Sequence, residues 1–307
     1  MISTIDGILE AARQLDHGII AVAAAHDEVV IEAVVNARKA GLVTPILVGH
    51  LDEISALLIK QGENPADYEM IAGSEDTDCA AKAVALCAEG KADFLMKGIL
   101  STADIMRAVF KKEGGLRTGR LTSHFMIYEM PAYGKFLLMT DGGLNTFPDL
   151  EKKADILENG AMVLEALGYE KIYASCICGA ETLNPKVQST LDADALSKMT
   201  ERWSKYNMTV IGPVALDLAT SKEACHHKRF HAEGAGEADI IMVPNYEVGN
   251  GIGKAISLYS GARNCGGIVG AKVPIVLVSR SDSADCKLAS IALGSVLAAN
   301  MRKAETL

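Results

Sequence analysis

The chain has 307 residues, of which 49% are hydrophobic and 22% charged, and its formal net charge at pH 7 is −9. This length and apolar content predict one large or two ordinary folded domains and exclude a disordered chain. The negative charge argues against nucleic acid or an anionic membrane as a partner. The longest uncharged apolar runs, Gly18–Ala25 and Val273–Val278, are far shorter than the roughly 18–20 residues that a membrane helix needs.

The cysteines and the first residues indicate the compartment. Seven cysteines at scattered spacing argue against a disulfide framework and favour a reducing, cytoplasmic setting. Cys176 and Cys178 form a C-x-C pair, but no second pair lies at the spacing of a zinc site, so we expect no metal. The N-terminal segment lacks a basic region followed by an apolar one, and we read it as mature sequence rather than a signal peptide.

Short apolar runs alternate with helical patterns along the first hundred residues, which predicts βαβ units with a parallel sheet. The expected strands are Gly18–Ala25, Thr44–Gly49, Tyr68–Ala72 and Ala92–Lys97. The expected helices are Glu28–Ala40, Ile54–Gln61 and Asp76–Glu89.

The middle of the chain changes pattern, because two strand-like segments, 124–130 and 135–140, follow each other without a helix and predict a hairpin. Alternation then resumes. The expected helices are Glu151–Leu167, Asp192–Trp203, Gly253–Gly261 and Asp285–Met301. The expected strands are Lys171–Cys178, Val210–Val214, Asp239–Val243 and Pro274–Ser279. We predict two α/β domains, the first from residues 1–123 plus 277–307 and the second from residues 124–276.

Ligands of open α/β sheets bind at the carboxyl ends of strands, so the loops after strands are the candidate sites. The first loop runs from Lys97 and Gly98 to Ser101 and Thr102, and it leads into a helix that carries Arg107. Glycine permits close backbone approach, and an exposed helix start offers N–H groups to an anion. Five cations and one Glu lie between Arg107 and Arg120, a local basic patch for a polyanion. An ordinary capped helix with a solvated basic face is the alternative.

The second candidate loop is Gly249–Lys254, which contains Asn250 and Gly251, follows an expected strand and opens an expected helix. This arrangement suits an anion, although it is neither a P-loop nor a dinucleotide fingerprint. A tight turn without chemical consequence is the alternative.

The third candidate loop, Ser279–Asp285, brings a hydroxyl, a guanidinium and two carboxylates to one strand–helix junction. Arg280 could bind phosphate through two hydrogen bonds. Either Asp282 or Asp285 could accept a proton or could simply cap a helix. In the fourth segment, Asp217–Lys228, the adjacent His226 and His227 cannot both face one metal from a helix. A polar contact to substrate, or no role, is the expectation there.

Several motifs in order resemble the phosphate acetyl/butyryltransferase family, nearest to its butyryl branch. The motifs are MKGILSTAD, GLRTGRLTSH, TDGGLNTFPDLEKKADI, NPKVQSTLDADALSKM, GPVALDLA…HHK, VPNYEVGNGIGK and VLVSRSDS. The resemblance runs from about residue 18 to the terminal helix. It implies two α/β domains with the active site in the cleft between them, a fold similar to the isocitrate and isopropylmalate dehydrogenases, and a homodimer or larger homo-oligomer.

The resemblance implies reversible transfer of an acyl group between coenzyme A and inorganic phosphate, with acyl-CoA and phosphate as substrates and no permanently bound cofactor or metal. Ser279 and Arg280 match the family's Ser-Arg pair, so Ser279 would orient the thiol or stabilise the carbonyl oxygen and Arg280 would bind phosphate. Arg107 matches an active-site arginine, and Asp285 would be the base, with Asp282 as its competitor. The expected substrate-binding residues are Lys97, Gly98, Ser101, Thr102, Asn250, Gly251, Asp282 and His227.

Two departures from the acetyl-specific members favour the butyryl branch. Their catalytic aspartate aligns with Cys286, one residue after Asp285, and an arginine on their glycine-loop helix aligns with Ser257. Acetyl specificity is the first alternative. A decarboxylating-dehydrogenase-like enzyme and a non-catalytic CoA-binding sensor are further alternatives.

Overall fold

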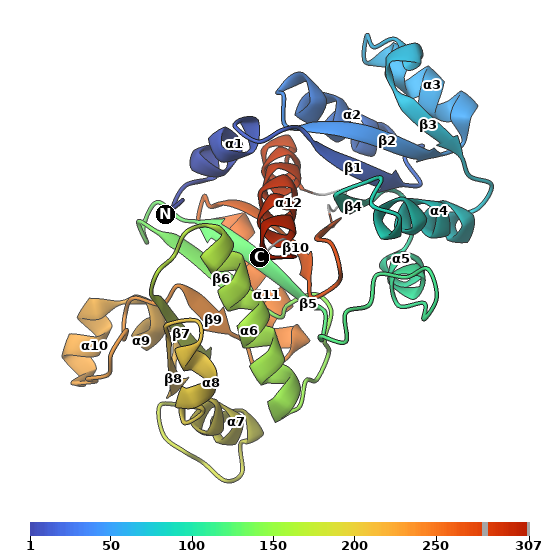
Figure 1. The fold of residues 1–307 in the computed structure, drawn as a ribbon. Coiled ribbons are helices and arrows are strands. Elements are labelled where there is room, and N and C mark those ends of the chain that lie inside the picture. Colours follow the sequence, from blue (N-terminus) through green and yellow to red (C-terminus); the bar gives the residue numbers. More distant parts are fainter. Residues whose placement is uncertain (278–281, 306–307) are drawn as a thin grey trace. The chain divides into compact units, whose positions relative to one another are not determined.

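A computed structural model describes residues 1–277 and 282–305, and the chain divides into two compact units (Figure 1). One unit comprises residues 1–4 and 121–264, and the other comprises residues 5–120 and 265–307. We call the first the central unit and the second the terminal unit. Residues 278–281, 306 and 307 are outside the description. The sequence placed the return to the first domain at residue 277, whereas the terminal unit already includes residues from Cys265 onward.

The terminal unit is built on a sheet in the order β3-β2-β1-β4-β11-β10. Its strands are β1 (Gly18–Ala23), β2 (Val43–Gly49), β3 (Glu69–Ala72), β4 (Phe94–Lys97), β10 (Arg263–Val269) and β11 (Ile275–Leu277). All neighbours are parallel except β10 and β11, which are antiparallel. The chain leaves β1 toward β2 on one side and reaches β4 on the other, so the strand order reverses at β1. The carboxyl ends of β1 and β4 are therefore at the topological switch point, where open α/β sheets bind ligands.

Helices cover both faces of this sheet, as expected for a parallel sheet with buried strands. The helices of the terminal unit are α1 (Ile5–Arg13), α2 (Glu28–Lys39), α3 (Leu51–Lys60), α4 (Asp76–Ala88), α5 (Thr102–Val109) and α12 (Ala284–Glu305), with a short 3-10 turn at Pro65–Asp67. α12 packs against α1 and α2, whereas α4 packs against α5 and β1 (Figure 1). α2 begins where predicted because Asp27 caps it, accepting the backbone N–H groups of Val29 and Val30.

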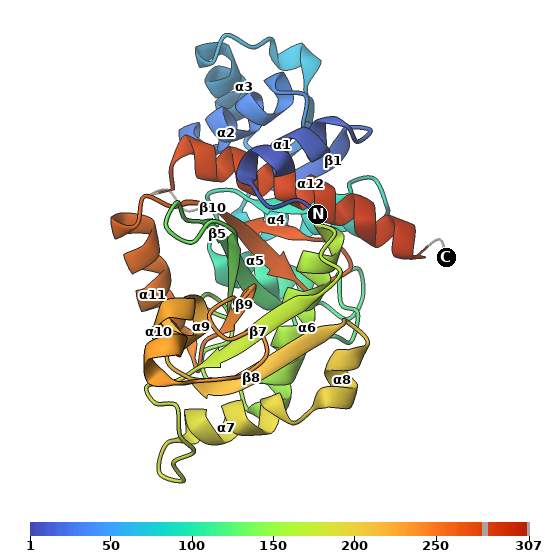
Figure 2. The same ribbon diagram turned by 90° about the vertical axis from the view of Figure 1, so that its left-hand side faces the viewer.

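The strands of the central unit lie in the order β5-β6-β9-β7-β8. Its strands are β5 (Ser123–Glu129), β6 (Phe136–Thr140), β7 (Ile172–Ile177), β8 (Met208–Val214) and β9 (Ile240–Met242). β5 and β6 form the antiparallel hairpin predicted from sequence, and the other neighbours are parallel. The helices are α6 (Leu150–Ala166), α7 (Gln188–Ser197), α8 (Thr200–Ser204), α9 (Leu216–Thr220), α10 (Lys222–Lys228) and α11 (Tyr246–Tyr259). Figure 2 shows α6, α7 and α8 beside β7 and β8.

Three expectations about elements were wrong or incomplete. The helix expected at Asp192–Trp203 is two helices, α7 and α8. The helix expected from Gly253 begins at Tyr246, because the Asn245 side chain accepts the Val248 N–H and caps the helix earlier. β10 was not predicted, because its centre, Asn264 to Gly267, is polar and glycine-rich.

Candidate functional site

The carboxyl ends of β1 and β4 meet at a close backbone contact in the terminal unit. Gly98 donates its N–H to Ala23 O at 2.8 Å, and Ile99 donates to Ala24 O at 3.0 Å. A Cβ atom on Gly98 would lie 2.1 Å from Ala24 O, so no other residue fits without moving backbone. Ala24 itself has a positive φ of 55°, a conformation that costs an L-residue about 1 kcal/mol. The loop after β4 is therefore fixed against β1.

Lys97, the last residue of β4, holds the same loop from the other direction. Its ammonium donates to the carbonyl oxygens of Gly98 at 3.1 Å and Leu100 at 3.0 Å. Lys97 also pairs in register with Ala23 of β1 and with Leu277 of β11. The predicted substrate residue Lys97 thus stabilises the loop, and it lies at the edge where residues 278–281 begin.

The start of α5 carries a chain of three polar side chains. The Ser101 hydroxyl accepts the Asp104 N–H at 3.1 Å and donates to the Asp104 carboxylate at 2.7 Å. Arg107 donates to the other carboxylate oxygen at 2.6 Å. The Ser101 hydrogen bond, and then Arg107, lower the pKa of Asp104. Ser101 is therefore the helix cap, and Arg107 is an exposed guanidinium held by Asp104, one turn into the helix that begins at Thr102.

Ser279 and Arg280, the two residues expected at the centre of the chemistry, lie outside the described residues. Leu277 ends β11 beside Lys97, and Ser283 caps α12 by accepting the Cys286 N–H at 3.1 Å. The described neighbours of these two residues are thus the end of β11 and the start of α12.

The three residues at the start of α12 have different settings. Asp285 is exposed in the first turn of α12, and the carbonyl oxygen of Asp282 accepts a hydrogen bond from the Lys287 ammonium. Cys286 is buried, and burial together with Asp282 raises the pKa of its thiol to about 12. At neutral pH Cys286 is accordingly a neutral thiol and does not replace a carboxylate as a base.

A stacked histidine pair at the same edge of the sheet was missed from sequence. His26, just after β1, and His50, just after β2, have ring centroids 4.0 Å apart and an interplanar angle of 12°. Burial and the neighbouring His50 lower the pKa of His26, and the hydrogen bond that His50 donates to the Glu53 carboxylate raises the pKa of His50. No sequence signal joins the two rings, because parallel pairing of β1 and β2 brings them together.

In the central unit, Asn250 and Gly251 do not lie in a loop, which corrects the prediction. Both lie in the second turn of α11. The glycines of this run serve packing: a Cβ on Gly249 would lie 2.7 Å from the Gly142 Cα, and one on Gly253 would lie 2.7 Å from the Tyr128 hydroxyl. α11 can approach the sheet closely because its buried residues are these two glycines. Asn250 is half-buried and Gly251 is exposed.

Asp141, which sequence reasoning did not select, organises the loop after β6. Its side chain is buried and accepts the backbone N–H groups of His124, Gly143, Leu144 and Asn145, plus the Asn145 side-chain amide at 2.7 Å. Gly143 lies against the His124 ring, where a Cβ would come within 2.6 Å. This carboxylate determines the conformation of the TDGGLN segment.

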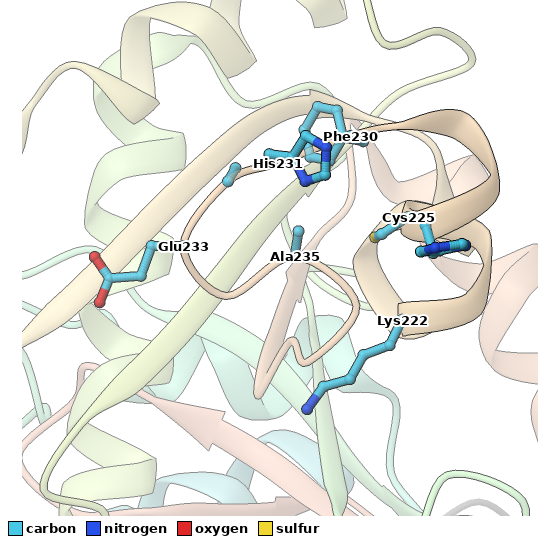
Figure 3. Close-up of a pocket in the computed structure, with 8 residues that line it drawn as sticks. Lys222, Cys225, Phe230, His231, Glu233 and Ala235 are labelled. Atoms are coloured by element: carbon cyan, nitrogen blue, oxygen red, sulfur yellow. The ribbon is translucent and has the colours of Figure 1, made fainter.

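His227 lies on α10 with its side chain 72% exposed, 3.5 Å from Glu223 one turn away. Beside α10 lies an open cavity of about 510 Å³, shown in Figure 3. Its lining residues are Lys222, Cys225, His226, Phe230, His231, Ala232, Glu233 and Ala235. None of the ten predicted site residues that the structure describes lines it, and His227 is only next in sequence to the lining residue His226.

Over residues 1–277 and 282–305, no three His, Cys, Asp or Glu side chains are grouped as metal ligands would be. None of the helices in that part of the chain combines the length and the apolar composition needed to cross a bilayer.

The family model described as "Phosphate acetyl/butaryl transferase" matches residues 59–295. The chain is 42% identical over 300 residues to a phosphate butyryltransferase from Clostridium acetobutylicum, covering 98% of this chain and 100% of that protein. It is 36% identical to a phosphate acetyltransferase from Rhizobium meliloti, covering 99% and 96%. The chain belongs to the phosphate acetyl/butyryl transferase family. The expected family and the expected class of enzyme, an acyltransferase, are confirmed.

Solved structures agree with this membership. A branched-chain phosphotransacylase from Enterococcus faecalis has a TM-score of 0.79 and 33% identity, covering 91% of this chain and 98% of that one. In fold alone, the family member also resembles a 4-hydroxythreonine-4-phosphate dehydrogenase from Burkholderia phymatum, with a TM-score of 0.56, 12% identity, and coverage of 92% and 99%. The expected α/β fold, shared with a dehydrogenase, is confirmed.

Proposed function

We propose that this acyltransferase moves a short acyl group, butyryl in preference to acetyl, reversibly between coenzyme A and inorganic phosphate in a ternary complex. The observation that carries the proposal is the carboxyl edge of the terminal unit's sheet. There Lys97, the fixed Gly98 loop and the capped start of α5 lie beside the strand end from which residues 278–281 continue. Crevices at such strand ends are where α/β proteins bind their ligands.

The proposed chemistry needs no covalent intermediate. In the direction that consumes acyl phosphate, a base takes the proton of the CoA thiol, the thiolate attacks the acyl carbonyl carbon, and the C–O bond to phosphate breaks. Phosphate leaves with the electron pair of that bond. Ser279 would orient the thiol or stabilise the carbonyl oxygen, Arg280 would bind phosphate, and Arg107 would neutralise charge. Placing two anionic substrates together and offsetting their charge are the main contributions to rate.

We propose Asp285 as the base, with Asp282 as its competitor. A carboxyl group with an ordinary pKa near ~3.9 is a weak base toward a thiol near ~8.5, so close alignment must compensate. The exposed first-turn position of Asp285 leaves its carboxylate able to reach a thiol. Comparing Asp285→Asn with Asp282→Asn decides between them, because only the base variant should lose the rise of kcat with pH. Equal pH profiles for both variants and the wild type would remove both residues.

The remaining predicted residues are proposed as substrate contacts: Gly98, Ser101, Thr102, Asn250, Gly251 and His227. The backbone of Gly98, the cap at Ser101 and the helix start at Thr102 belong to the edge described above. Asn250 offers a half-buried amide on α11, and His227 an exposed imidazole on α10. Asn250→Ala and His227→Ala should each raise KM without abolishing turnover.

The decisive experiment measures thiol release from acetyl-, propionyl-, butyryl- and hexanoyl-CoA with and without phosphate. We expect phosphate-dependent release that is fastest with butyryl-CoA, although one methylene changes discrimination by only about 1–3 kcal/mol. Fastest release with acetyl-CoA would establish the acetyl alternative. Thiol release at the same rate with and without phosphate, or no thiol release from any of the acyl-CoA substrates, would contradict the proposal. Turnover of NAD with a hydroxy acid would instead indicate a dehydrogenase, and CoA binding without turnover a sensor.

Arg280→Ala tests the phosphate site. It should raise the KM for phosphate much more than the KM for butyryl-CoA, because the guanidinium would lose its bidentate contact with the anion. Lys198→Ala, which removes an exposed cation of the central unit, is the matched control. An unchanged phosphate KM in the Arg280 variant would exclude Arg280 from the site.

We further propose a cytoplasmic homodimer or larger homo-oligomer. All seven cysteines are free thiols, which suits a reducing compartment. Sedimentation equilibrium of the purified chain measures the assembly, and a monomer at micromolar concentration would contradict it.

A further inference from the structure

The stacked rings of His26 and His50 differ in charge, and His50 is the cation. Its Nδ1 lies 2.8 Å from the Glu53 carboxylate, and its Nε2 lies 3.2 Å from the Ser74 carbonyl oxygen. Both partners accept hydrogen bonds, so only the protonated ring, with an N–H on each nitrogen, satisfies both of them. The raised pKa of His50 agrees with this assignment.

His26 is the neutral ring, because its surroundings have no place for a second proton. Within residues 1–277 and 282–305, the buried His26 Nδ1 has no hydrogen-bond partner. A Cβ atom on Gly49 would lie 2.6 Å from this nitrogen, so the end of β2 packs directly against it. A proton on Nδ1 would be a buried donor without an acceptor, on a ring whose centroid is 4.0 Å from that of a cation. We assign the single proton of His26 to Nε2 on this geometry.

Carboxylates around His26 favour its charged form but do not prevail. The ionisable side chains that act on His26 or on the backbone beside it, besides the ring of His50, are Asp27 at the cap of α2, Glu53 on α3, and Asp76 and Cys79 on α4. The three carboxylates raise the pKa of His26, whereas burial and then His50 lower it, and the net direction is down. Burial raises the pKa of the Cys79 thiol, which therefore stays neutral.

His26 follows the backbone that supports the loop after β4. Asp27 donates its N–H to Ala25 O at 2.8 Å, so the chain turns tightly at His26. Two residues before His26, the Ala24 carbonyl oxygen accepts the Ile99 N–H of that loop at 3.0 Å. A displacement of the His26 ring is therefore transmitted along directly bonded residues to the contact that fixes the loop.

We propose that neutral His26, stacked on cationic His50, is a positioning residue that holds the end of β1 against the loop after β4, and that a second proton on the pair releases this loop. The inference rests on the proposed function, in which the loop contacts substrate. Bound substrate selects the ordered loop, so protonation of His26 should lower kcat/KM for butyryl-CoA more than it lowers kcat at saturating substrate.

The pH dependence of kcat/KM for butyryl-CoA tests this role in two variants. Wild-type kcat/KM should fall about tenfold per pH unit once the pH is below the pKa of His26, which is itself below the ordinary value of ~6.5. His26→Gln should lack this fall, because glutamine takes up no proton. His50→Gln should move the fall to higher pH, since removing the neighbouring cation raises the pKa of His26. His17→Gln, at an exposed histidine just before β1, is the control and should follow the wild type.

Hydrogen–deuterium exchange of the intact protein tests the same contact without turnover. The N–H groups of Gly98 and Ile99 should exchange faster, relative to their intrinsic rates at each pH, as the pH of the wild type falls through the same range. His26→Gln should show no such acceleration. Identical pH profiles for the wild type and His26→Gln in either measurement would overturn the proposal.

A purely structural role of the pair predicts a different result. It would lower kcat/KM by the same factor at every pH in His26→Gln and His50→Gln, without moving the profile, and that outcome would also contradict the proposal. Absence of acyl transfer in the wild type would defeat the proposed function, whereas the exchange of Gly98 and Ile99 would still decide whether His26 holds the loop.

Discussion

Two loops of this transferase follow buried strands, one in each unit, and each is shaped by a single charged residue of opposite sign. After β4, the Lys97 ammonium gathers the carbonyl oxygens of Gly98 and Leu100. After β6, the buried Asp141 carboxylate gathers backbone N–H groups of its own loop and of His124. In both, a glycine lets backbone meet backbone, Gly98 against β1 and Gly142 against α11. A buried or half-buried charged side chain next to such a loop can therefore serve to fix the loop's backbone, whether the charge is positive or negative.

The two glycines should differ most in their tolerance of a methyl group. A Cβ on Gly98 would lie 2.1 Å from backbone oxygen, whereas one on Gly142 would be 3.0 Å from its nearest atom. Gly98→Ala should lower the free energy of unfolding by about 3 kcal/mol or more, and Gly142→Ala by roughly 1 kcal/mol. Urea unfolding measures both. Gly179→Ala, with no atom within 4 Å, is the control. An equal decrease in the free energy of unfolding for Gly98→Ala and Gly142→Ala would contradict the difference expected from the two Cβ distances.

Removing the charge of Asp141 should have the next largest effect. Asp141→Asn replaces an acceptor oxygen with an amide that faces N–H donors, which should destabilise the protein by about 3 kcal/mol. Exposed Asp52→Asn is the matched control and should change little. Thermal unfolding gives both values. A loss below that of the control would mean that the loop keeps its conformation without the carboxylate.

Lys97→Met tests the opposite charge and should affect stability less, by about 1–2 kcal/mol, because carbonyl groups at a half-buried edge can turn to water. Its effect on turnover should exceed its effect on stability, since the loop shape at the proposed site depends on it. Stability from urea unfolding and kcat/KM for butyryl-CoA are measured on the same preparation. Full activity in a destabilised variant would restrict Lys97 to folding alone.

A mild change of pH should have the smallest effect on stability, and it acts through the stacked pair His26 and His50. The pKa of His26 is lowered, so the unfolded chain binds that proton first as pH falls. The free energy of unfolding should therefore fall as pH drops through ~6.5 toward the lower folded-state pKa. The raised pKa of His50 contributes with the opposite sign. His26→Gln should reduce the acid loss, and identical pH profiles for the variant and wild type would contradict the assignment.

Local pattern predicted more of the fold than of the site. β1, β2 and α2 follow from apolar runs and an Asp27 cap, which are properties of neighbouring residues. The start of α11 was misjudged because a run of glycines indicates a loop, and only contact with Gly142 and Tyr128 explains glycines inside a helix. Asp141 and the pair of His26 with His50 acquire their partners from strands distant in sequence. The hydrophobic periodicity of the sequence carries no information about contacts between residues on strands that are far apart in the chain.

The terminal unit takes its residues from both ends of the chain, with β11 inserted beside β4. During synthesis on the ribosome, β4 therefore cannot pair with β11 until the whole central unit has been synthesised. The central unit can fold by itself during that interval, since domains generally fold as units in the order they emerge. The strand that leads into Ser279 and Arg280 arrives last, so the proposed active edge is completed only in a nearly finished chain. Incomplete products of synthesis would have a folded central unit and no acyl transfer.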